Sequence, residues 1–387
     1  MSAALALAGA GGMALEDGGG VDFGRLRRER RERLLEGMGA AGLDAVVLGR
    51  SANVRYASGA RQLWRSGASP FAPASVVVRA TGRVHLLSVW DDGIPPEIGH
   101  EDLYGISWNP QNLLGALRNI PGLPGANVVG TDSLTPFFGD LLRQVAPDAR
   151  LTNATGVMFE ARAIKTPDEV ACIVGAATVA EAALAALRRA VVPGITERQL
   201  LGIFDETISG LGAPTPPSEG VVFATARRGP VRYRNLVSDR PVGDDELVVL
   251  TPAALCAGYE GEVGRTVGSG ATPPRGAPEL ADRCHRALDA LVAACRPGNT
   301  GRDLYRAWEA AGEPEPVVAL AHGIGLGAEQ PLIGFGRGAD ATIVGGSVLS
   351  VQSWVTAEGT GGYLHRDLVL VGEDGPEVLT RDERSGA

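Results

Sequence analysis

The stretch 243-GDDELVVLTPAALCAGYEGEVGRTV-267 decides the fold of this chain. Its first half is an apolar run typical of a buried strand, and a second strand-like run follows after a very short break. We therefore expect strands over 246–255 and 258–267. Strands joined this closely can only return alongside each other, which predicts antiparallel pairing.

Long helices flank these strands. Thr166 is a suitable N-cap, Pro167 suits the first helical position, and Glu169 completes a capping box, so we expect a helix that ends before Pro193–Gly194. We expect further helices over 196–211, 277–296 and 301–311, and further strands over 219–225, 347–355 and 366–371. Helices against an antiparallel sheet predict an α+β domain over residues 156–387.

The first part of the chain follows another pattern. Residues 22–42 have a helical period of apolar residues, and the basic run within them is typical of the exposed side of an amphipathic helix. Strand-like segments then alternate with helical ones, which predicts an α/β domain over residues 22–155. The expected strands are LDAVVLG (43–49), SVVVRA (75–80), RVHLLSV (83–89) and ANVVGT (126–131), with helices over 111–119 and 135–146. The Ala/Gly-rich residues 1–21 are predicted to be a disordered tail.

Composition excludes several classes of protein. A net charge of −9 argues against nucleic-acid binding, which needs a concentrated basic face. The four cysteines lack paired spacing and lie in apolar contexts, so we expect reduced core residues in a cytoplasmic protein. We find no basic region ahead of an apolar core at the N-terminus and expect no segment long and apolar enough to span a membrane.

Several segments together resemble the creatinase/aminopeptidase P/prolidase family. The segments are LDAVVLGRSANVRYASG (43–59), RAIKTPDEV (162–170), the 243–267 stretch, AHGIGL (321–326) and DLVLVGEDGPEVLT (367–380), in the family's order and spacing. The resemblance implies an α/β amino-terminal domain followed by the family's α+β "pita-bread" domain. It also implies a homodimer.

Members of this family bind two divalent metals through two aspartates, a histidine and two glutamates. The resemblance places these five positions on Thr251, Glu262, His322, Gln352 and Arg366. Hard cations need several carboxylate oxygens, and this set supplies one carboxylate. A guanidinium would also repel a cation by roughly 4 kcal/mol per unit charge pair at about 4 Å, with an effective dielectric near 20. We expect no metal cofactor.

A buried arginine needs an acidic partner. For Arg366 the sequence offers Glu262, Glu260 or Glu329, of which we favour Glu262. The alternative is a single metal held by His322, Glu262 and His365, with Arg366 turned away.

Other residues of the expected site also follow from the resemblance. Two histidines of the family correspond to Arg232, next to Tyr233, and to Glu329. We expect His322, Glu329 and Glu262 to be catalytic acid/base groups. We expect the substrate-binding residues to be Arg232, Tyr233, Arg366, Gln352, Thr251, His365 and Trp64, with Arg227, Arg228 and Arg234 near the approach to the site.

These residues support a function prediction with two alternatives. The first expectation is a metal-independent enzyme that acts on a small amide, amidine or amino-acid-like metabolite, by C–N bond hydrolysis, a lyase step or cyclisation. Creatinase, which lacks the metal centre, is the family's precedent. The alternatives are a non-catalytic pseudo-peptidase that binds a peptide or metabolite, and a mononuclear metal-dependent Xaa-Pro peptidase. Buried ionisable residues are costly in a pure scaffold, which favours a small-molecule site.

Overall fold

The structure is a computed structural model of the whole chain. It describes residues 20–60, 74–88, 93–105, 109–132, 134–213, 217, 221–225 and 230–381. These residues form two compact units, with the division between Arg162 and Ala163. The sequence prediction had placed it at residue 155. Trp64, Arg227, Arg228 and the predicted tail up to residue 19 lie outside the described residues.

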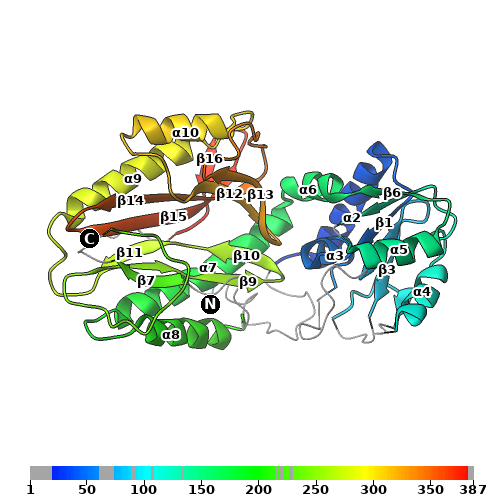
Figure 1. Cartoon of the computed structure of the whole chain (residues 1–387), viewed down its shortest axis with the longest axis horizontal. Helices are drawn as coiled ribbons and strands as arrows, with labels where there is room; N and C mark the ends of the chain where they lie inside the picture. Colours follow the sequence, from blue (N-terminus) through cyan, green and yellow to red (C-terminus); the bar gives the residue numbers. More distant parts are fainter. Residues whose placement is uncertain are drawn as a thin grey trace. The chain divides into compact units, whose positions relative to one another are not determined.

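The first unit is an α/β layer built on a six-stranded sheet in the order β4-β3-β2-β1-β5-β6 (Figure 1). Its helices are α2 (Phe23–Ala40), α3 (Ser51–Ser58), α4 (Pro110–Arg118), α5 (Pro136–Val145) and α6 (Thr155–Ala163), with the short 3-10 helix η1 (His100–Asp102). Its strands are β1 (Ala45–Leu48), β2 (Ser75–Val78), β3 (Arg83–Leu87), β4 (Leu103–Tyr104), β5 (Val128–Thr131) and β6 (Arg150–Asn153). β1 pairs parallel to β5 and antiparallel to β2, and α4 and α5 cover one face of the sheet. This confirms the predicted α/β class.

The second unit is the α+β domain that the 243–267 stretch predicted. Its helices are α7 (Pro167–Ala190), α8 (Glu197–Gly210), α9 (Ala277–Ala294) and α10 (Gly301–Ala310). Its strands are β7 (Val221–Thr225), β8 (Leu247–Thr251), β9 (Ala253–Cys256), β10 (Tyr259–Glu262), β11 (Arg265–Gly268), β12 (Ala319–Gly325), β13 (Gly327–Gly334), β14 (Val348–Ala357), β15 (Gly361–Val371) and β16 (Pro376–Val378). Each expected long strand of the stretch is divided into two, since Pro252 interrupts the first and Val263–Gly264 the second.

The strands of the second unit form three groups. One sheet has the order β11-β8-β7, β9 and β10 form a hairpin, and a five-stranded sheet has the order β13-β12-β14-β15-β16. β12 and β13 were not predicted, because their glycines suggested a loop. Gly264 joins two of these groups, since its N–H donates to Arg366 O at 3.1 Å and Arg366 N–H donates back to Gly264 O at 2.9 Å.

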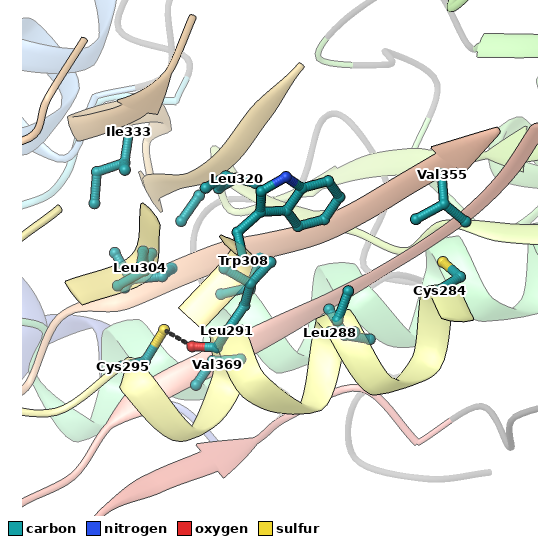
Figure 2. Close-up of a cluster of buried hydrophobic side chains, with 14 of the residues drawn as sticks. Cys284, Leu288, Leu291, Cys295, Leu304, Trp308, Leu320, Ile333, Val355 and Val369 are labelled. Atoms are coloured by element: carbon teal, nitrogen blue, oxygen red, sulfur yellow. Dashed lines mark hydrogen bonds between the residues drawn. The ribbon is translucent and has the colours of Figure 1, made fainter. Parts of the chain in front are cut away.

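Helices cover the outer faces of these sheets (Figure 1). α9 packs over β14 and β15, and α10 packs on α9, with Trp308 of α10 in a core that Figure 2 shows. α7 packs on the β9–β10 hairpin so closely that a Cβ at Gly261 would lie 2.1 Å from Ala177 N. The predicted capping box of α7 is confirmed, because Thr166 and Glu169 exchange hydrogen bonds of 2.9 and 3.2 Å.

One expectation about α7 was wrong. By length and composition this helix is apolar enough to cross a membrane, which the sequence analysis did not anticipate. More than half of its apolar window, 56%, is buried inside the protein, as in the core helix of a soluble domain. Its apolar length is therefore explained by packing against α8, β9 and β10.

Candidate functional site

The strands of the second unit bring four distant residues together. Glu262 ends β10, His322 lies on β12, Gln352 on β14 and Arg366 on β15. Gln352 and Arg366 are direct cross-strand partners, so their side chains project from the same face. The fifth position, Thr251 at the end of β8, is buried near the same point, because a Cβ at Gly264 would contact both Thr251 Cγ2 and Arg366 Cβ.

The guanidinium of Arg366 is the centre of this cluster. Its Nη1 lies 2.5 Å from Glu262 Oε2, while Nε and Nη2 donate to Gln352 Oε1 at 3.0 and 2.6 Å. Gln352 is itself fixed, since its Nε2 donates to Ala319 O at 2.8 Å. All three guanidinium nitrogens are therefore engaged within the protein. Arg366 pairs with Glu262, the first of the three acids that the sequence offered.

Charge pairing dominates the ionisation of Glu262 and Arg366. Burial alone would raise the pKa of Glu262, but the adjacent Arg366 charge and then His322 hold this pKa well below its usual range. Burial would likewise lower the pKa of Arg366, but Glu262 and then Tyr233 raise it. The pair is therefore fully ionised at neutral pH.

The second carboxylate oxygen of Glu262 faces His322. The distance from His322 Nε2 to Glu262 Oε1 is 3.3 Å, and the His322 side chain is 19% exposed. Ser350 lies directly opposite His322 on β14, and its buried hydroxyl helps to lower the pKa of Glu262. His322 is thus the partly open member of an otherwise buried cluster, oriented by a carboxylate.

Glu260 is a further acid in the cluster, on the same face of β10 as Glu262. Burial raises its pKa to about 8, and the negative charge of Glu262 contributes to this shift. Glu260 is therefore mainly protonated at neutral pH, as a neutral acid beside an ion pair. From the sequence, Glu260 was predicted only as a possible partner for Arg366.

Glu329 has a different environment from the one expected. Its Oε2 lies 2.8 Å from Nζ of Lys165, and its Oε1 accepts the N–H of Leu326 at 3.1 Å. Both side chains are buried, with Lys165 2% and Glu329 5% exposed. Sequence reasoning missed Lys165, although a signal was present, because it is the only lysine among 36 basic residues.

Tyr233 contributes an aromatic wall to the site. Its ring packs edge-on against Phe223 and Trp354, with centroid distances of 5.4 and 5.6 Å. The neighbouring Arg232 is exposed, and its guanidinium is thus available to solvent.

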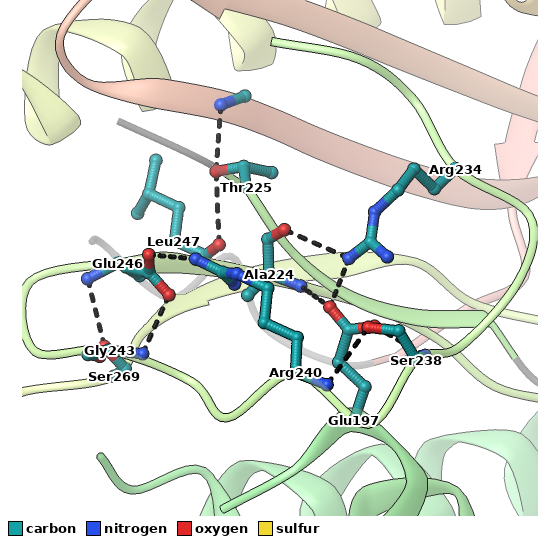
Figure 3. Close-up of polar contacts among 11 residues, drawn as sticks. Glu197, Ala224, Thr225, Arg234, Ser238, Arg240, Gly243, Glu246, Leu247 and Ser269 are labelled. Atoms are coloured by element: carbon teal, nitrogen blue, oxygen red, sulfur yellow. Dashed lines mark hydrogen bonds and ion pairs between the residues drawn. The ribbon is translucent and has the colours of Figure 1, made fainter. Parts of the chain in front are cut away.

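The segment that carries Tyr233 is anchored by Glu197 at the start of α8 (Figure 3). The buried Glu197 carboxylate accepts Ala224 N–H at 2.9 Å and the N–H and hydroxyl of Ser238, both at 2.8 Å. It also pairs with Arg234, whose guanidinium lies over the ring of Phe223. Arg234 is therefore a structural anchor rather than a group at the approach to the site.

His365 does not lie with the cluster. Side chains alternate along a strand, so His365 projects from the face of β15 opposite to Arg366. Its Nε2 lies 3.2 Å from Asp367 Oδ2 and its ring packs against His285 at 5.1 Å. Asp367 in turn accepts a 2.9 Å bond from Arg265 Nη2. The structure therefore does not bring His365 together with His322 and Glu262, and the substrate-binding expectation for His365 is corrected.

Comparisons with known proteins identify the family of the chain. Residues 171–373 match the model of metallopeptidase family M24, and residues 30–164 match the creatinase/prolidase N-terminal domain. The chain belongs to metallopeptidase family M24. The predicted resemblance and the two-domain pita-bread fold are thereby confirmed.

Individual relatives of the chain have low sequence identity to it. A Xaa-Pro dipeptidase of Pyrococcus horikoshii is 24% identical over 374 residues, which cover 93% of this chain and 99% of the relative. The agropine synthesis cyclase of Rhizobium rhizogenes is 27% identical over 325 residues, 75% of each chain. The crystal structure of the prolidase from Pyrococcus horikoshii OT3 shares the fold with a TM-score of 0.77 at 22% identity, covering 93% of this chain and 100% of that one.

Proposed function

We propose that this M24 member is a metal-independent acid/base enzyme that acts on a C–N bond of a small amide, amidine or amino-acid-like metabolite. The observation that carries the proposal is the 2.5 Å contact between Arg366 Nη1 and Glu262 Oε2. A permanent cation of the protein thus binds the carboxylate that the family resemblance assigns to a metal.

The donor set present does not fit two divalent cations. Within the described ranges no group of three or more His, Cys, Asp and Glu side chains is placed to hold a metal ion. Thr251 and Gln352 contribute neutral oxygens, and the oxygen of Gln352 already accepts two bonds from Arg366. Hard cations need several charged oxygens to replace their water, and Glu262 alone does not supply them.

The same arrangement suits proton transfer by His322. A carboxylate near one ring nitrogen fixes the orientation of an imidazole and stabilises its protonated form. We infer that His322, oriented by Glu262, accepts a proton from the attacking water and that the leaving nitrogen of the substrate receives a proton in return. Tyr233 and Thr251 line the substrate side, and the exposed Arg232 suits an anionic group of the substrate.

The experiment is turnover of a substrate panel, including glycyl-L-proline as an amide and creatine as a guanidino compound, with elemental analysis of the purified protein. We expect turnover of at least one compound to persist after EDTA and to fall at least about 100-fold in H322A. Stoichiometric manganese, zinc, iron or cobalt, together with activity that disappears on chelation, would refute metal independence.

Two relatives support specific alternatives. The name of the Pyrococcus horikoshii relative, Xaa-Pro dipeptidase, favours a peptidase, and the family's description as a metallopeptidase favours metal dependence. Stoichiometric metal with activity lost on chelation would support this alternative. The name of the Rhizobium rhizogenes relative, agropine synthesis cyclase, favours a cyclisation, which is among the reactions compatible with His322 chemistry. Product analysis by mass spectrometry separates hydrolysis, which adds one water, from cyclisation, which removes one.

A non-catalytic role as a pseudo-peptidase is the remaining alternative. Thermal shift across the same panel tests it, because a ligand that binds the folded state raises the unfolding temperature. Stabilisation by a peptide without turnover would favour this role. A homodimeric assembly and a cytoplasmic location stay predictions, and light scattering of the purified protein tests the first.

A further inference from the structure

The hairpin that carries His322 is irregular beside this residue. His322 pairs with Leu332, whereas the next residue, Gly323, pairs with Glu329, so Gln330–Pro331 stand between consecutive partners. The bulge requires glycine on the other strand, because a Cβ at Gly323 would lie 2.2 Å from Gln330 O. Bulges redirect the side chains next to them. The direction of the His322 ring therefore depends on this local backbone.

A buried ion pair holds the far side of the same bulge. Glu329, the last regular partner before it, lies 2.8 Å from Lys165 Nζ, which also donates to Ala163 O at 3.3 Å. Lys165 is fixed through its backbone too, since its N–H donates to Gly346 O at 2.8 Å. The bulge is thus tied to the segment that precedes α7.

Gly325 gives this ion pair its space. A Cβ at this position would lie 2.5 Å from Glu329 Oε1 and 2.9 Å from Lys165 Cε. The pair is therefore pressed directly against the backbone of β12, three residues after His322. Close-packed interiors transmit strain, and Glu329 Oε1 also accepts the N–H of Leu326 at 3.1 Å, so we expect a shift of these charges to displace the strand that carries the imidazole.

The burial of this pair does not by itself indicate a stabilising role. Replacing a buried ion pair by apolar residues is often neutral or stabilising, so such a pair is weak evidence for a stabilising role. The alternative use is to select one local conformation over others. Here the conformation in question is the bulge adjacent to the partly exposed histidine of the site.

We propose that Lys165 is a positioning residue for His322. Its ammonium group binds Glu329 and thereby holds the β12–β13 bulge in the form that directs the His322 imidazole toward Glu262. This inference rests on the proposed function insofar as His322 moves a proton. It replaces the catalytic role first expected for Glu329 by a positioning role.

The test is NMR spectroscopy of the protein labelled with ¹³C in its histidine rings. The chain has five histidines, so the spectrum contains few ring signals. The His322 signal is identified by its absence in H322N. The variant K165M/E329L removes both charges together and so leaves no unpaired buried charge. The control R283M/E313L removes another pair of the same unit, in which Arg283 Nη2 lies 2.7 Å from Glu313 Oε2.

We expect K165M/E329L to remain folded, to shift the His322 signal and its titration midpoint, and to lower turnover by about 10–100-fold. K165R, which keeps a cation, should retain more of the wild-type signal and activity. The control R283M/E313L should leave the His322 signal unchanged. An unchanged His322 signal and titration in folded K165M/E329L would overturn the proposal.

A second variant covers the case in which K165M/E329L does not fold. E329Q keeps the shape of the side chain and removes its charge, and an unchanged His322 signal there would count equally against the proposal. The signal needs no turnover, so the two proposals fail separately. A shifted signal in a protein without hydrolytic activity upholds the positioning role alone. Hydrolysis that depends on His322, with an unshifted signal, upholds the function alone.

Discussion

Removing the guanidinium by R366M tests whether a protein cation satisfies the charge of Glu262. Both partners are buried, with the Arg366 side chain 11% and the Glu262 side chain 7% exposed. Breaking a buried pair by removing one partner costs about 3–5 kcal/mol. The oxygen of Gln352 also loses the two donors at 3.0 and 2.6 Å, which adds about 1–3 kcal/mol for an unsatisfied buried acceptor. We therefore expect R366M to lower the free energy of unfolding by about 4–8 kcal/mol.

The matched variant is E262L/R366M, which removes both charges. Since a buried pair is often replaced by apolar residues at little cost, we expect the double variant to recover most of the stability lost in R366M. The assay is equilibrium unfolding in urea, followed by tryptophan fluorescence and by circular dichroism.

The pH dependence gives an independent check on the same variants. In the wild type the pKa of Glu262 is lowered in the folded state, so its contribution to stability is present above the unfolded value and is lost as pH falls through the folded value. R366M lacks this contribution, and its deficit should therefore shrink as the pH falls below about 4.3. A loss below about 1 kcal/mol in R366M, or a double variant no more stable than the single one, would refute the role of Arg366 as the internal cation.

Three further changes give simple outcomes. G325A should cost about 1–3 kcal/mol, because its Cβ would lie 2.5 Å from Glu329 Oε1, and an unchanged midpoint in urea unfolding contradicts this. E260Q should raise the unfolding temperature more at pH 9 than at pH 4, because burial raises the pKa of Glu260 to about 8 in the folded state, so ionisation opposes folding increasingly from the unfolded value up to about pH 8; equal shifts at both pH values would exclude the effect. Q352E/R366E restores two carboxylates, so manganese should raise its unfolding temperature and leave that of the wild type unchanged, as differential scanning fluorimetry would measure.

The sequence predicted the fold and the central pair because both follow from motifs of fixed spacing. The 243–267 stretch placed Glu262, and the final strand placed Arg366, although 104 positions separate the two. His365 was assigned to the wrong side because the alternation of side chains along a strand was not applied to neighbours in sequence. The partner of Glu329 could not be predicted from the sequence, because Lys165 lies 164 positions away and meets Glu329 only where the segment before α7 packs against β13.

The charge balance of the centre is the reason for assigning the proposed chemistry to one residue, His322. Each carboxyl group of the described centre is neutralised within the protein: Glu262 by Arg366, Glu329 by Lys165, and Glu260 by its own proton. A buried centre without uncompensated charge does not need an ion from solution to fold. Within this centre the imidazole of His322 is 19% exposed and is therefore accessible. We therefore expect the proton of a reaction at this site to pass through His322, and the H322A variant tests this expectation.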